Sequence, residues 1–123
     1  MDQVLDCDFL PVVAVGVHPK NTLMMLDIAS GKHVVYDGVA ANDHLISGHL
    51  TRPTVNAGDN VEATLRVPHG LSVGLSDAAI TLGQKVHAAP AGKMSSAVTT
   101  GKYMGMAWEA VGAGEYFRYR PSF

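Results

Sequence analysis

The chain has 123 residues, of which 47% are hydrophobic and only 16% are charged, and its net charge is −2. A chain of this length forms one domain with a core that needs no disulfide or structural metal. Its basic residues are scattered along the sequence, which excludes the footprint of a nucleic-acid-binding protein. So few charges predict that part of the apolar surface faces another subunit or an obligate partner.

The N-terminal region is not expected to contain a secretion signal. Asp2 and Asp6 exclude a positively charged start, and no apolar run approaches the ~20 residues of a membrane span. The single cysteine, Cys7, excludes an intrachain disulfide and a thiolate metal site. We therefore expect a protein made in a reducing cytoplasm, with no membrane contact.

Residues 1–10 contain three acids and a few apolar residues without a clean period. This pattern predicts an extended N-terminal arm in front of a single β-rich domain at residues 11–123. Val4, Leu5 and Phe9 have no local core to enter on such an arm. They either fold back or add to a neighbouring chain, for example by strand addition, and we take them as candidate contact residues.

The first half of the domain is predicted as short strands separated by turns. Residues 12–17 predict one strand, and residues 22–28 and 32–36 predict a hairpin around Ser30 and Gly31. Residues 39–52 fit either a short helix or an irregular strand. Residues 56–60 predict a turn, and residues 61–67 follow it with the cleanest apolar–polar alternation in the chain.

The second half begins with a short strand candidate at residues 71–75. Residues 76–79 follow as either a turn or a single helical turn, for which Ser76 offers an N-cap. Two hairpins follow, at residues 79–98 and 101–120, each with alternating residues around a glycine-centred reversal. In the second hairpin Met104, Met106 and Trp108 are expected to share one face, and we interpret them as core anchors.

Gly105, between these anchors, predicts a bulge or a close backbone approach. Taken together, the pattern predicts a mainly β fold: a small β-barrel or sandwich of short antiparallel strands, with at most one or two short helices and the extended arm.

Two stretches resemble a known family. The run A-x-x-x-G-Q-K-V-H-x-x-x-A-G-K-M at residues 79–94, followed by G-K-Y-M-G-M-A-W-E-A-V-G-A-G-E at residues 101–115, is similar to the C-terminal half of tailed-phage capsid decoration (cement) proteins. Residues 23–38, L-M-M-L-D-I-A-S-G-K-H-V-V-Y-D-G, resemble a stretch of the lambda-type head decoration protein. Residues 39–78 carry no such likeness.

The resemblance implies a structural virion protein that binds the outside of the expanded phage head and stabilises contacts between major capsid subunits. It implies the major capsid protein as partner, a homo-oligomer with a trimer favoured, and neither enzymatic activity nor a cofactor. A cement protein needs a rigid body, an arm that pairs with the lattice and many weak contacts summed by repetition.

Two other classes of function stay open. A small β-domain that binds carbohydrate or a host surface would need exposed aromatic side chains. The candidates are Trp108, Tyr103, Tyr116 and Tyr119.

A metal-dependent hydrolase would use Asp43, His44 and His49, although the five-residue spacing of the histidines suits neither a strand face nor a helix face. We expect these histidines to be ordinary surface or hydrogen-bonded residues and predict no metal site.

Overall fold

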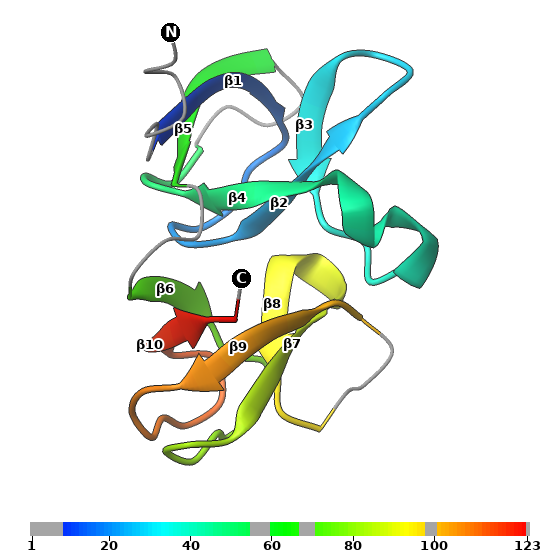
Figure 1. Cartoon of the computed structure of the whole chain (residues 1–123). Helices are drawn as coiled ribbons and strands as arrows, with labels where there is room; N and C mark the ends of the chain where they lie inside the picture. Colours follow the sequence, from blue (N-terminus) through cyan, green and yellow to red (C-terminus); the bar gives the residue numbers. More distant parts are fainter. Residues whose placement is uncertain (1–8, 55–59, 67–70, 98–100, 123) are drawn as a thin grey trace, which may run out of the picture.

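The computed structural model of the protein describes residues 9–54, 60–66, 71–97 and 101–122. These residues form two five-stranded sheets (Figure 1). The first sheet contains β1 (Phe9–Val15), β2 (Leu23–Asp27), β3 (Lys32–Val35), β4 (Ile46–Leu50) and β5 (Asn60–Arg66). The second contains β6 (Ser72–Leu75), β7 (Lys85–Ala89), β8 (Lys93–Ser95), β9 (Tyr103–Ala107) and β10 (Tyr116–Pro121). The predicted mainly β class with a small barrel is confirmed.

The first sheet closes into a barrel in the order β1-β3-β2-β4-β5. Its longest seam joins β1 to β5 in antiparallel register, from Phe9 opposite Arg66 to Val15 opposite Asn60. The predicted hairpin of β2 and β3 is present, with Asp27 opposite Lys32. Residues 39–52, for which a helix and a strand were both open, form one of each: the 3-10 helix η2 (Ala40–Leu45) and then β4.

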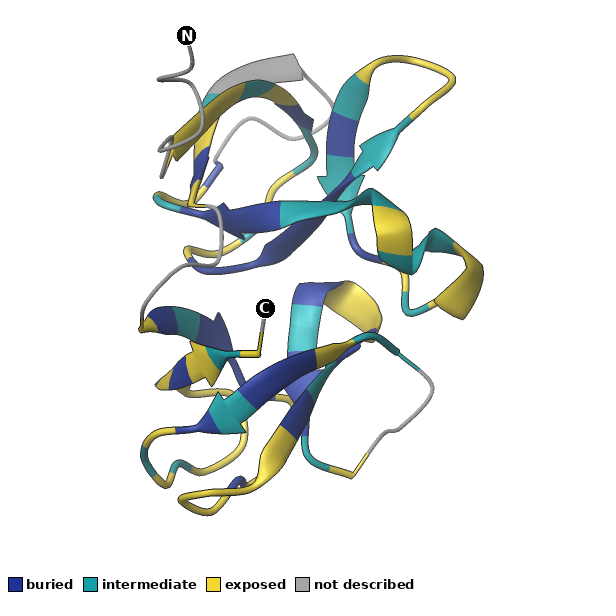
Figure 2. Ribbon diagram, in the orientation of Figure 1, coloured by how far each residue is buried: buried dark blue, intermediate teal, exposed yellow. Residues whose placement is uncertain are grey.

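The second sheet has the order β6-β10-β9-β7-β8 and contains both predicted C-terminal hairpins. The first hairpin pairs β7 with β8 across the short 3-10 helix η3 (Pro90–Gly92), and the second pairs β9 with β10. Along β10 the alternation is regular: Phe117 and Tyr119 are buried, whereas Tyr116, Arg118 and Arg120 are exposed (Figure 2). This sheet therefore has one face on the core and one face in solvent.

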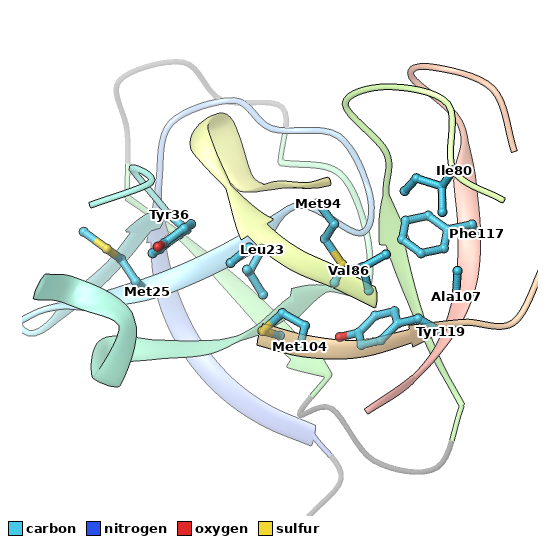
Figure 3. Packing of buried hydrophobic residues seen from close by; sticks show 11 residues of the cluster. Leu23, Met25, Tyr36, Ile80, Val86, Met94, Met104, Ala107, Phe117 and Tyr119 are labelled. Carbon is cyan, nitrogen blue, oxygen red and sulfur yellow. The ribbon is translucent and has the colours of Figure 1, made fainter. Parts of the chain in front are cut away.

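One strand supplies side chains to both cores. On β2, Met24 enters the barrel with Ala14, Leu50 and Leu65, whereas Leu23 and Met25 point to the second sheet. There they join the larger core. That core also contains Tyr36, Ile80, Val86, Ala88, Met94, Met104, Ala107, Phe117 and Tyr119 (Figure 3). Burial on both faces explains why β2 is an apolar run rather than an alternating strand.

The predicted bulge at Gly105 is present and has a consequence for its neighbours. The register of β9 against β7 shifts between Val86 and His87, beside Gly105, whose φ is +151°. A Cβ at this position would lie 2.0 Å from the carbonyl oxygen of Arg120, so the backbones approach closely as well. The bulge breaks the alternation, and it separates Met104 from Met106 and Trp108.

Trp108 is therefore not a core anchor, and that prediction is wrong. Met104 is fully buried, Met106 is half-buried and Trp108 is 41% exposed. The prediction assumed unbroken alternation through Gly105, whereas the extra residue turns Met104 inward and leaves Met106 and Trp108 on the outer face.

Three further expectations need correction or fall outside the described residues. The arm was predicted to reach residue 10, but Phe9 and Leu10 already pair with β5 as the start of β1. Of the two alternatives for residues 76–79, the helical turn is not formed: the hydroxyl of Ser76 donates to the carbonyl of Gly112 and accepts from the N–H of Glu115. Residues 1–8, the body of the turn at 56–60 and the end of the alternating segment at 67 lie outside the described residues.

Candidate functional site

A slot of about 600 Å³ opens in the barrel wall between β1 and β3. The two strands run parallel and pair only at Ala14 and His33, so the wall stays open along the first part of β1. The slot is lined by Leu10, Pro11, Val12, Val13, Gly31, His33, Ala63 and Thr64. Five of these residues have apolar side chains, and polar groups contribute nearly half of the surface, so the slot suits a peptide segment of a partner rather than a small charged ligand.

Pro11 occupies this open side of β1 without loss of a hydrogen bond. The carbonyl of Thr64, its partner on β5, accepts from the N–H of Thr51 at 3.1 Å and so faces away from β1. Thr64 and Pro11 therefore form a pair that exchanges no hydrogen bonds, and the backbone of Pro11 faces the slot. Proline, which has no backbone N–H, is tolerated at this position because the ladder needs no N–H from it.

Apolar side chains around the slot are partly exposed. Phe9 is 49% exposed, Leu10 37% and Val13 39%, all on the strand that follows directly from the predicted arm. Of the three predicted contact residues, Phe9 is the first residue of β1 and directly precedes the slot residue Leu10, whereas Val4 and Leu5 lie outside the described residues. The slot itself could not be predicted, since it depends on how β1 meets β3.

The predicted acid–histidine group does not form a site. His49 is buried, whereas His44 is exposed on η2. The carboxylate of Asp43 accepts a 2.5 Å hydrogen bond from the hydroxyl of Tyr36. Burial and this carboxylate raise the pKa of Tyr36. Among the described residues no three His, Cys, Asp or Glu side chains lie close enough to hold a metal ion.

His49 instead connects the two sheets. Its Nδ1 lies 2.9 Å from the carbonyl oxygen of Asn21, and its Nε2 lies 2.7 Å from the hydroxyl of Tyr119 on β10. A carbonyl oxygen only accepts, so Nδ1 carries the proton and Nε2 accepts from Tyr119. Burial is the main cause that lowers the pKa of His49 to about 4, and the nearby charge of Arg66 adds to it. This histidine is a structural element of the core.

The four aromatic candidates divide between core and surface. Tyr119 is fully buried, whereas Tyr103, Trp108 and Tyr116 are 40%, 41% and 49% exposed. The exposed three are Tyr103 on β9, Trp108 just after β9, and Tyr116 on β10.

No helix in the described part of the chain is long and apolar enough to cross a membrane. No protein-family model matches the chain, and no curated protein sequence matches it.

Proposed function

We propose that the chain is a structural virion protein that binds the outside of the expanded phage head and stabilises contacts between major capsid subunits. The slot of the barrel, at the point where the predicted arm joins β1, carries this proposal. A body with a receptor slot beside an arm that carries a few apolar residues is suited to hold a neighbouring protein chain at two points. The resemblance of residues 23–38 and 79–115 to decoration proteins supports the same function.

The exposed apolar side chains support an assembled state. In addition to the apolar residues beside the slot, Val17 is 52% exposed and Ile28 is 70% exposed. Surface of this kind is covered in oligomers and complexes. We infer a homo-oligomer, and the resemblance implies a trimer. Many copies of this oligomer would contact the major capsid protein over the surface of the shell.

The two other functions differ in their support. A hydrolase that uses Asp43, His44 and His49 is disfavoured because His49 is buried between Asn21 and Tyr119. A carbohydrate-binding module needs exposed aromatic side chains, and three of its four candidates are exposed. That observation favours carbohydrate binding as a second function of the same body.

Cosedimentation with phage heads tests the main proposal. We expect the protein to bind expanded, decoration-free heads in a saturable manner and to ignore unexpanded proheads. Val13→Asp, which places a charge on an exposed position of the slot, should weaken this binding at least about tenfold, since a carboxylate is costly to bury against apolar groups. Leu82→Asp makes a similar change in the second sheet's loop, and it should bind like the wild type.

Two results would count against the proposal. Absence of wild-type binding to expanded heads contradicts the capsid function itself. Equal binding by wild type, Val13→Asp and Leu82→Asp leaves the function standing but removes the slot as its contact.

A further inference from the structure

The outer face of the second sheet carries a row of side chains across three strands. Met106 on β9 lies opposite Lys85 on β7 and opposite Arg120 on β10. Directly opposed residues of neighbouring strands point to the same face, and two strand spacings separate the outer members by about 10 Å. Two cations therefore flank a half-buried methionine on a solvent-exposed surface.

An open groove of about 430 Å³ lies along this row. It is lined by Tyr103, Met106, Arg120, Pro121 and Ser122. The bulge beside Gly105 places Tyr103 and Met106 on the same face although they are three residues apart. Tyr103 is 40% exposed, and Trp108 extends the apolar line of the same face beyond Met106.

Two cations lie at this groove. Arg120 is part of its lining, and Lys85 lies beside it, with its Nζ 6.0 Å from the centre of the lining Tyr103 ring and so within cation–π range. Neither cation makes an ion pair with a described residue. The carboxylate of Glu109 is engaged by a different cation, Arg118, with 3.2 Å between Nε and Oε2. An anionic ligand would therefore meet two uncompensated cations.

From this juxtaposition we propose that the outer face of the second sheet binds an acidic oligosaccharide. The rings of Tyr103 and Trp108 offer flat apolar surface on which the C–H face of a sugar packs, and Lys85 and Arg120 pair with its carboxylate, sulfate or phosphate groups. The described residues of the groove include no carboxylate or amide side chain, the groups that would bind the hydroxyls of a neutral sugar.

Other anionic ligands fit this face less well. An acidic peptide that adds as a strand needs a sheet edge, whereas the groove lies on a face formed by β7, β9 and β10. A single-stranded nucleic acid gains its affinity from many phosphate contacts, and two cations on a chain of net charge −2 supply few. A glycan with widely spaced charges matches two cations separated by two strand spacings.

The test is a glycan array with uronate-, sialate-, sulfate- and phosphate-bearing oligosaccharides, followed by titration calorimetry of the full chain with the best binder. We expect binding by an acidic glycan, and at least about tenfold weaker binding by its neutral counterpart, in which the acid is removed or esterified. The double variant Lys85→Gln/Arg120→Gln should lose at least about tenfold as well. The matched variant Lys20→Gln/Arg52→Gln removes two exposed barrel cations and should bind like the wild type.

Several outcomes would overturn the inference. These are no binding to any acidic glycan, equal binding of acidic and neutral forms, or an equal loss in both double variants. Tighter binding of a dT12 oligonucleotide or a poly-glutamate peptide, abolished by the Lys85/Arg120 variant, would assign the face to another ligand class. The inference is independent of capsid binding, because Lys85→Gln/Arg120→Gln should still cosediment with expanded heads.

Discussion

Phe117→Ala should lower the free energy of unfolding by about 3–5 kcal/mol. Phe117 is 1% exposed on β10 and packs in the core between the two sheets, with its ring 6.0 Å from that of Tyr119. Truncation removes the buried ring and leaves a cavity that the paired strands cannot collapse to fill. Urea unfolding followed by circular dichroism measures the loss, which is a large part of the stability of an ordinary domain.

Trp108→Ala is the matched control, because it removes an even larger aromatic group from the same sheet. Trp108 lies on the outer face and is 41% exposed, so we expect a loss of about 1 kcal/mol or less. Equal losses for Trp108→Ala and Phe117→Ala would show that the indole belongs to the core. A loss below about 1 kcal/mol for Phe117→Ala would contradict the packing of the second sheet on β2.

Acid should destabilise the fold through His49. Burial lowers the pKa of this histidine to about 4 in the folded state, against an ordinary value of 6.5 in the unfolded chain. Between these two pH values the unfolded chain binds the proton and the folded protein does not. The contribution of neutral His49 is therefore complete above pH 6.5 and is lost as the pH falls to about 4, by about 3 kcal/mol in total.

Denaturant midpoints measured from pH 7 to pH 4 test this prediction. His49→Gln removes the titrating group, so its stability should fall less steeply with decreasing pH than that of the wild type. It should not become flat, because burial also lowers the pKa of His33 and acts in the same direction. Leu82→Gln, at a 67% exposed position without a titrating group, should keep the wild-type slope. Identical slopes in all three proteins would contradict the role of His49.

Local signals predicted most of the fold. The β2–β3, β7–β8 and β9–β10 hairpins were predicted because their turn residues and alternation lie within short segments. The alternating segment became β5, with Leu65 buried and Thr64 exposed. Gly105 was correctly predicted to mark a bulge. These features depend on neighbours in the sequence, where propensity and turn chemistry act directly.

The features that were missed depend on distant contacts. The bulge at Gly105 was predicted, but the exposure of Trp108 was not. To predict that exposure one must know at which residue the register shifts. The hydrogen bond between His49 and Tyr119 joins residues 70 positions apart, and neither residue carries a local sign of it. The slot exists because β1 and β3 meet only at Ala14 and His33, which follows from barrel closure and not from either strand's sequence.

The cement function is tested most directly by the heat stability of decoration-free expanded heads with and without the protein. Light scattering and release of packaged DNA would follow head disruption at increasing temperature. We expect saturating protein to raise the disruption temperature clearly, since a ligand that binds only the intact shell stabilises it by mass action. Val13→Asp should protect less at the same concentration. Full occupancy of the heads without any rise in the disruption temperature would contradict the proposal that the protein stabilises the capsid.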